Sequence, residues 1–396
     1  MGCNSALSPN LLPFASTSRI SIKPGKCPNL ASSTVCFHNN QSNGKREEKL
    51  MVAAVASIPF PQPENVDVDY LEKEFGGHGV TFEGIGHSCV AKISLENRST
   101  AILMLPTGLI TSYKPCMWHG GTDEFLHSVV SEDDAAIQGG VSLAFNFANE
   151  DATNEVSWSP TKWALQDIKR SSQDSIQVQL ICTDAEDMVE VKYNVTLEED
   201  ALSSELVISN SKSSPIRLTG SVLSHLTLSS PDATFAIGLE GSDFLGLSPF
   251  LSNFSIIPPD FAQNNEFGFS QLWNQMSLWG TRNGNKVDEA KSNVKETQLQ
   301  MEGEENDNYK HLRDQMSRIY TSAPRNFTLI DRGRRNSVAI GRHGFDELYM
   351  FSPGSIHEIY SQYAYICVGQ SALLKPIIIG SKEVWRGGQH LHNPNL

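Results

Sequence analysis

The sequence predicts a mainly β protein. Between Met188 and Leu228 apolar and polar residues alternate, which is the pattern of half-buried antiparallel strands. Turn-forming residues recur along the chain, with 29 glycines and 19 prolines, whereas long helical periodicities are scarce. With 396 residues and 39% hydrophobic content, the chain can bury a large core, as one big β domain or as two ordinary ones.

Three consecutive strands are predicted in that region. From Val189 to Leu197 every odd position is apolar or aromatic, and a second strand follows after the turn at Glu199-Asp200. The third strand carries Ile216, Leu218, Val222, Leu226 and Leu228 on one face. His225 falls on the opposite face, with Arg217, Thr219 and Ser221, where a histidine can point into a polar groove.

Further strands are expected on both sides of this region. Gly139-Gly140 indicates a close backbone approach before the strand 141–147. The other expected strands are Val90–Leu95, Ala101–Leu105, Leu109–Tyr113, Asn326–Asp331, Ser337–Arg342, Glu347–Phe351, Tyr363–Val368 and Ile377–Ile379.

A polar insertion at about 261–317 interrupts the strand rhythm. It carries an aromatic cluster (Phe267, Phe269, Trp273, Trp279) and then an acidic stretch that includes Glu302, Glu304, Glu305 and Asp307. A connection this long within a domain is usually functional or disordered. Because aromatic anchors are enriched where proteins meet, the four aromatic residues are the predicted partner interface, and the alternative is that they cap the core of the domain itself.

The N-terminus has the composition of a chloroplast transit peptide. Residues 1–46 contain no Asp or Glu, five basic residues and many serines, without a compact apolar segment. We therefore assign residues 1–55 to a transit peptide and linker, and 56–396 to a β domain. A disordered basic tail is the alternative.

The charge and the cysteines of the remaining chain exclude several classes of function. Loss of residues 1–46 removes five positive charges, so the net charge changes from −14 to −19. A chain this acidic is a poor nucleic-acid ligand. Cys89, Cys116, Cys182 and Cys367 are scattered without CxxC spacing, which argues against a zinc site or an iron–sulfur cluster. No apolar run is long enough for a transmembrane helix, so we expect a soluble or peripheral protein.

Two other motifs contain residue types that occur in binding sites. His119, Asp123, Glu124 and His127 lie within nine residues, but their spacing matches no helical or strand ligand pair, so no metal is predicted. Arg332-Gly-Arg-Arg335 is a basic turn, interpreted as a solvated hairpin or a partner contact. No GxGxxG stands between a strand and a helix, and no cofactor is predicted.

The order of several motifs resembles aldose and hexose-6-phosphate 1-epimerases over about residues 80–390. The segments that carry the resemblance are Leu105–Tyr113, Gly139–Leu143 with Trp158 and Trp163, Leu223–Leu228, Ile237–Phe244, Tyr365–Val368 and Glu383–Gln389. The resemblance implies a galactose mutarotase-like fold, a twisted β-sandwich with a cup on one concave sheet. In that family a histidine protonates the ring oxygen of the sugar and a carboxylate takes the proton of the anomeric hydroxyl.

The chain departs from this family at the positions of the chemistry. His225 matches the family histidine, but Gly369 stands where the catalytic carboxylate is expected. Gln138 replaces the arginine of the phosphosugar epimerases, and the segment Glu155–Lys162 lacks the second family histidine. We therefore expect a pseudo-enzyme with no catalytic residues, in which His225 is vestigial and structural.

A second resemblance concerns function. Tyr70–Gly79, Met117–Gly121 and Gly139–Phe145 are similar to the subunit 2 family of subcomplex B, on the stromal side of the chloroplast NADH dehydrogenase-like (NDH) complex of plants. The resemblance implies a non-catalytic structural and assembly subunit, peripheral to the thylakoid membrane. Its partners would be the other subunits of subcomplex B and, through the complex, photosystem I, in NDH-dependent cyclic electron flow.

Two alternatives remain from the sequence. The chain could be a stromal hexose or hexose-phosphate 1-epimerase with a relocated base such as Glu240, or a carbohydrate-binding protein. It could also be a soluble monomer without a partner.

Overall fold

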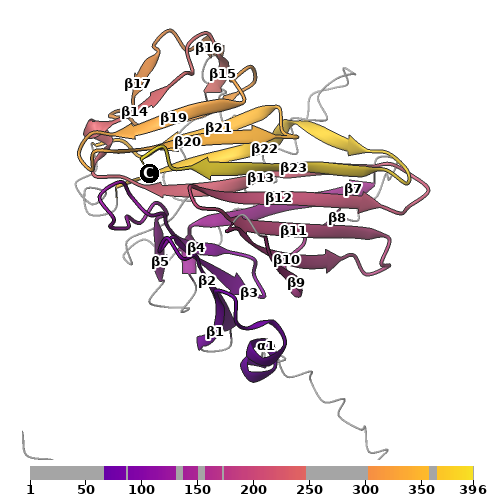
Figure 1. Cartoon of the computed structure of the whole chain (residues 1–396). Coiled ribbons are helices and arrows are strands. Elements are labelled where there is room, and N and C mark those ends of the chain that lie inside the picture. The colour runs from indigo at the N-terminus through magenta and orange to yellow at the C-terminus, as the bar shows by residue number, and fades with distance from the viewer. Residues whose placement is uncertain are drawn as a thin grey trace, which may run out of the picture. The chain divides into compact units, whose positions relative to one another are not determined.

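The structure is a computed structural model, and it describes residues 67–85, 88–130, 137–149, 157–171, 174–246, 302–355 and 364–395. The chain divides into two units, Met1–Pro61 and Gln62–Leu396, and every described residue belongs to the second. Two large antiparallel sheets form this unit, with helix α1 (Val68–Phe75) at its N-terminal end (Figure 1). The predicted transit peptide lies outside the described residues.

The larger sheet has twelve strands within the described residues. Their spatial order is β1 (Val80–Ile85), β2 (Ser88–Ser94), β3 (Thr100–Leu105), β4 (Ile110–Lys114), β7 (Val141–Asn149), β13 (Ile216–Thr227), β22 (Tyr365–Ile379), β21 (Glu347–Ser352), β18 (Met316–Tyr320), β15 (Asp243–Gly246) and β16 (Glu302–Glu304). The short strand β8 (Ser157–Trp158) pairs with β7 outside this order.

The smaller sheet has nine strands in the same described ranges. Their order is β17 (Tyr309–His311), β14 (Thr234–Ile237), β19 (Asn326–Asp331), β20 (Asn336–His343), β23 (Val384–His392), β12 (Ala201–Asn210), β11 (Val189–Leu197), β10 (Ile176–Thr183) and β9 (Ala164–Arg170). The C-terminal strand β23 therefore lies between β20 and β12 in the middle of the sheet (Figure 1). A separate hairpin, β5 (Ser128–Val130) with β6 (Ile137–Gly139), and a 3₁₀ turn, η1 (Pro231–Ala233), complete the elements.

The alternation of apolar residues explains how the two sheets meet. In β11 all five odd positions are at most 2% exposed, and they share one apolar cluster with Leu218, Val222 and Leu226 of β13 in the other sheet. Each fully buried side chain of this size stabilises the fold by about 1.5–3 kcal/mol. The central strands of both sheets therefore hold the sandwich together.

The predicted strands are confirmed in most places. Val189–Leu197 and Asn326–Asp331 agree with β11 and β19 at both ends, and the third strand of the opening motif is β13. The prediction missed the strands at 164–170 and 176–183. Polar and charged residues dilute the apolar ones in 164–170, whereas 176–183 begins with the same apolar–polar alternation as β11.

Gly140 makes the close approach that the sequence predicts. Its φ of +61° is unfavourable for other residues, and a Cβ there would lie 2.0 Å from the carbonyl oxygen of Ile110. The Gly140 N–H donates to the carbonyl oxygen of His127, and its carbonyl oxygen accepts the N–H of His225. This glycine therefore fixes the backbone of His225, on β13, relative to the backbone of His127, which directly precedes the hairpin β5–β6.

The prediction of two separate strands near the C-terminus is wrong, because β22 is continuous from Tyr365 to Ile379. Its register against β13 shifts between Ala372 and Ile377, so the backbone bulges there. The buried carboxylate of Glu347 accepts the N–H groups of Leu373, Leu374 and Lys375 at 2.6, 3.0 and 2.6 Å. One side chain thus replaces the backbone partners that the bulge removes.

The predicted interruption of the strands at about 261–317 is also wrong in its last part. From Glu302 the chain forms β16, β17 and β18, so residues 302–317 belong largely to the two sheets. Glu305 is 4% exposed rather than solvated, because Arg318 donates to its carboxylate, Lys310 lies 3.5 Å from it and the Tyr320 hydroxyl donates at 3.1 Å. Two cations that follow the acidic stretch in sequence, Lys310 and Arg318, make the burial of Glu305 possible.

No helix within the described ranges combines the length and the apolar character that a membrane span requires.

The bulge in β22 gives a prediction about stability. Glu347→Ala should lower the free energy of unfolding by about 2–4 kcal/mol, because three partly buried backbone N–H groups lose their acceptor. Glu347→Gln keeps one acceptor oxygen and should cost less. Urea unfolding of the purified chain measures both. Asp346→Ala is the matched control, since the ion pair of Asp346 with Arg325 is exposed and should contribute less than about 1 kcal/mol; an equal loss in the control would contradict the prediction.

Candidate functional site

The pairing of β13 with β22 brings the two family positions onto one face of the larger sheet. His225 is opposite Cys367, and Leu223 is opposite Gly369. On its other edge β22 pairs with β21. There Phe351 is opposite Cys367, and Tyr349 is opposite Gly369. This face, on the side of β13 away from the main core, corresponds to the predicted cup.

The cup is apolar where a sugar site would be polar. Its floor is a second hydrophobic cluster, separate from the main core, that consists of Leu223, Ile319, Tyr349, Phe351, Tyr365 and Cys367. The sequence prediction of a polar groove around His225 is therefore wrong in its chemistry. The sequence pattern of β13 describes one strand of this face, whereas β18, β21 and β22 supply most of its side chains.

His225 is held in the wall of this cluster. It is 7% exposed, and its ring centroid lies 5.8 Å from that of Tyr365. The ring of His127 stacks on Tyr365 from another side, at 5.4 Å. Burial, with a smaller contribution from the nearby His127, lowers the pKa of His225 to about 4. His225 is consequently neutral at neutral pH.

Gly369 has no room for the side chain that the family carries. A Cβ at this position would lie 2.5 Å from Ser221 Oγ and 2.8 Å from Leu223 Cδ2. Real Cβ atoms do not approach other atoms so closely, and the Ser221 hydroxyl is fixed by Ser371 Oγ at 2.9 Å. A carboxylate at position 369 would therefore require the Ser221 and Leu223 side chains to move from their present positions.

The other residues that the sequence comparison with the epimerases singles out are far less buried, where the structure describes them. Gln138, which stands in the place of an arginine, is exposed on β6, and Glu240, the candidate relocated base, is exposed in the turn after Leu239. Glu155 lies outside the described residues, and Lys162 is exposed. The four residues of the predicted partner interface, Phe267, Phe269, Trp273 and Trp279, also lie outside the described residues.

The residues weighed as a metal site are used by the fold. The Glu124 carboxylate accepts from the N–H groups of Tyr113 and Leu126, and His119 Nδ1 accepts from the Gly121 N–H. In the part of the chain that the structure describes, no three His, Cys, Asp or Glu residues are arranged to hold a metal ion.

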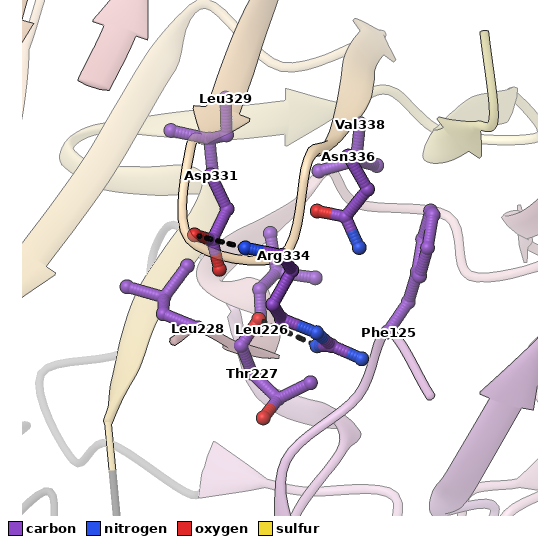
Figure 2. A pocket seen from close by; sticks show the side chains of 9 residues that line it. All are labelled: Phe125, Leu226, Thr227, Leu228, Leu329, Asp331, Arg334, Asn336 and Val338. Carbon is purple, nitrogen blue, oxygen red and sulfur yellow. Dashed lines mark hydrogen bonds between the residues drawn. The ribbon is translucent and has the colours of Figure 1, made fainter. Parts of the chain in front are cut away.

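The basic turn borders a small pocket at one end of the sandwich. Figure 2 shows Arg334 in this pocket, with its N–H bonded to Asp331 and its guanidinium directed at Thr227. The guanidinium donates to the carbonyl oxygen of Thr227 at 3.4 Å and lies 4.0 Å from the Asp123 carboxylate. Arg332 stacks on the ring of Phe235 at 4.4 Å. Both side chains serve the fold, whereas Arg335 is exposed. The full lining is Phe125, Leu226, Thr227, Leu228, Leu329, Asp331, Arg334, Asn336 and Val338.

Sequence reasoning missed one conspicuous residue. Trp118 is 75% exposed. It lies within the motif Met117–Gly121, where nothing in the local sequence pattern distinguishes an exposed tryptophan from a buried one.

The lowered pKa of His225 predicts a pH dependence of stability. The unfolded histidine has a pKa of about 6.5 and the folded one of about 4, so between these values only the unfolded chain takes up the proton. The contribution of His225 to the free energy of unfolding is fully present above the pKa of the unfolded histidine. It is lost as the pH decreases from about 6.5 toward 4. From pH 7 to pH 5 the loss from this group should be about 2 kcal/mol.

Urea unfolding of His225→Gln at both pH values tests this prediction. The decrease between pH 7 and pH 5 should be smaller by that amount than in the unmodified chain. Burial also lowers the pKa of His127, so His127→Gln added to His225→Gln should flatten the dependence further. An unchanged decrease in the single variant would show that His225 does not titrate as described.

Comparisons with known proteins place the fold and the family. No family model matches the chain. The Arabidopsis thaliana protein named NDH-dependent cyclic electron flow 5 is 42% identical over 393 residues, with 98% of each chain covered. A Salmonella typhimurium protein described as a mutarotase superposes with a TM-score of 0.52 at 12% identity, over 80% of this chain and 94% of the other.

The likeness to the Salmonella typhimurium structure confirms the predicted fold class and, at 12% identity, shows the fold alone. The likeness to the Arabidopsis protein extends over almost the whole of both chains. The chain therefore belongs to the family of the Arabidopsis protein NDH-dependent cyclic electron flow 5, and it has the mutarotase-like sandwich that its sequence predicts.

Proposed function

We propose that the chain is a non-catalytic structural and assembly subunit of the chloroplast NDH complex and supports NDH-dependent cyclic electron flow around photosystem I. The observation that carries the proposal is the 42% identity, over 98% of both chains, to the Arabidopsis protein named for this electron flow. The transit-peptide composition of residues 1–46 supports a chloroplast location.

The cup supports the non-catalytic part of the proposal. Ring opening needs a base at the anomeric hydroxyl and an acid at the ring oxygen. Gly369 has no titratable group, Ser221 and Leu223 fill the space beside it, and His225 is buried in an aromatic wall. The residues of an epimerase site are thus replaced by residues that stabilise a scaffold.

The placement within the complex is a proposal from the resemblance. The chain would sit in subcomplex B at the stromal face of the thylakoid membrane, peripheral to it, and contact the other subunits there and, through the complex, photosystem I. The net charge of −14 supports attachment through proteins, because an anionic membrane surface repels such a chain.

Complementation of a plant line that lacks the protein tests this function. The unmodified chain and His225→Gln should both restore comigration with the NDH complex on native gels and the electron flow measured by the fluorescence rise after illumination, each within about twofold, because His225 performs no chemistry. The purified domain 56–396 should not accelerate hexose mutarotation. Turnover that disappears in His225→Gln would instead establish an epimerase, and failure of the unmodified chain to comigrate would contradict the assembly role.

A further inference from the structure

Strand β9 forms one edge of the smaller sheet (Figure 1). Among the described residues it pairs only with β10, so its other side presents backbone N–H and C=O groups to which no strand is bonded. Ile168 shows the effect on packing. It points to the core but is only half-buried, whereas Val178, opposite it on β10, is 0% exposed. A further strand beside β9 would cover this apolar surface.

The hairpin between β9 and β10 decides which backbone groups of β9 are directed outward. The Ser171 N–H donates to the carbonyl oxygen of Ser175 at 2.8 Å, and the register of the two strands, continued by one residue, places these residues opposite each other. In an antiparallel pair, opposite residues alternate between hydrogen-bonded and non-hydrogen-bonded pairs. Lys169, two positions before Ser171, is therefore bonded to β10. Ile168 and Arg170, on either side of it, direct their N–H and C=O groups away from β10.

The strands at the other ends of the two sheets are capped or short. On β1 the Glu72 carboxylate of helix α1 accepts the N–H of Phe82 at 2.8 Å. The strands β16 and β17 have three residues each, and β16 carries Glu302 and Glu304. Strand β9 has seven residues, and in the described part of the chain no side chain bonds to its backbone. It is thus the edge most open to pairing.

The outer face of β9 carries one charge of each sign. Asp167 and Lys169 alternate with Ile168, which packs on the core, so both side chains lie on the outer face of the sheet. Their charged atoms are 3.0 Å apart. The segment 167–169 therefore places opposite charges symmetrically about Ile168, whose backbone groups are directed outward.

An antiparallel β9 from a second copy of the chain fits this pattern in one register. With Ile168 opposite Ile168 of the second copy, their backbones form a hydrogen-bonded pair, and Lys169 faces Asp167 of the other copy on both sides of the twofold axis. With the axis at Lys169, two lysines would be opposite each other, and with the axis at Arg170, two arginines. Like charges directly opposite each other destabilise a strand pair. The charges therefore select the register centred on Ile168.

We propose that two copies of the chain associate through β9, in the antiparallel register centred on Ile168, so that their smaller sheets form one continuous sheet. The proposal goes beyond the proposed function and does not rest on it. Charge complementarity commits the edge to a second copy, because reversal of the strand direction brings Asp167 of each copy to Lys169 of the other. The two Ile168 side chains, opposite each other on the inner face, also cover apolar surface that each copy leaves exposed.

The net charge of the chain does not prevent this contact. The charge of −14 repels a second copy at long range, but charges more than about 8 Å apart are largely screened at physiological ionic strength. On β9 itself the charges are balanced, since Arg170 lies 2.9 Å from Glu96 and 3.2 Å from Asp174. A bulge next to Asp167 ends the regular part of the edge. The contact is therefore short, and we expect a weak, reversible dimer.

Charge reversal tests the pairing by sedimentation equilibrium of the purified full-length chain over a series of concentrations. The unmodified chain should show a monomer–dimer equilibrium. Lys169→Asp and Asp167→Lys each place like charges opposite each other twice, and each should raise the dissociation constant of the dimer at least about tenfold. The double variant Asp167→Lys/Lys169→Asp restores opposite charges across the axis and should return the constant to within about threefold of the unmodified value.

Glu190 and Lys192 of β11 are the matched control pair. Their charged atoms are also 3.0 Å apart, two residues apart on one strand, but β11 lies between β10 and β12 and has no free edge. Lys192→Asp should therefore leave the dissociation constant within about twofold of the unmodified value.

A backbone variant tests the hydrogen bonds separately. Ile168→Pro removes an N–H that the ladder to β10 does not use, so proline is compatible with this position of an edge strand. The dimer should be lost in this variant and retained in Ile168→Val, which keeps the N–H. Thermal midpoints of all variants show whether the fold is kept, and the charge-reversal variants decide the question if Ile168→Pro does not fold.

Three outcomes would overturn the pairing through β9. They are a chain that stays monomeric over the whole concentration series, a dimer that survives both single charge reversals, and a double variant that dissociates as readily as the single ones. Each of these leaves the proposed function standing, because that function is judged by comigration of the chain with the NDH complex.

Discussion

The antiparallel pairing of β13 with β22 is the interaction on which the rest of the structure depends. One face of β13 supplies Leu218, Val222 and Leu226 to the core between the sheets, and the other face carries His225. Since β22 contains a bulge between Ala372 and Ile377, the pairing is possible only if something else satisfies the displaced backbone groups. Glu347, from the next strand, does this with both carboxylate oxygens. The burial of one charged group thus permits the sheet to be continuous across its centre.

The two faces of this ladder have different roles. The core face is packed as in any sandwich, but the opposite face, which is the cup in this fold, is also packed with apolar side chains. Adding apolar residues there stabilises the central strands and removes the polar surroundings that hold a sugar. Stabilisation of the scaffold and loss of a sugar site are therefore two results of the same substitutions, and Gly369 with its close neighbours Ser221 and Leu223 shows both.

Sequence reasoning predicted those parts of the structure that depend on local periodicity. The alternation in β11 and the face of His225 on β13 could be predicted because strand geometry alone decides them. The continuity of β22 could not, since the group that satisfies its bulge lies on another strand. The apolar cup was missed for the same reason, because its side chains come from four strands that are distant in sequence. The exposure of Trp118 depends on how Asn395 and Ser99 hold its loop, and neither residue is near it in the chain.

Glu305 has a consequence for how this family can diverge. The strands β15 and β16 pair with each other although residues 247–301 separate them in sequence. Directly after β16, Glu305 contacts Arg318 of the larger sheet and Lys310 of the smaller one. The chain is thus fixed to both sheets directly after β16, and the entropy of closing a longer connection rises only slowly with its length. A lineage can consequently lengthen, shorten or replace the sequence between these two strands by small evolutionary steps while the inherited sandwich stays the same.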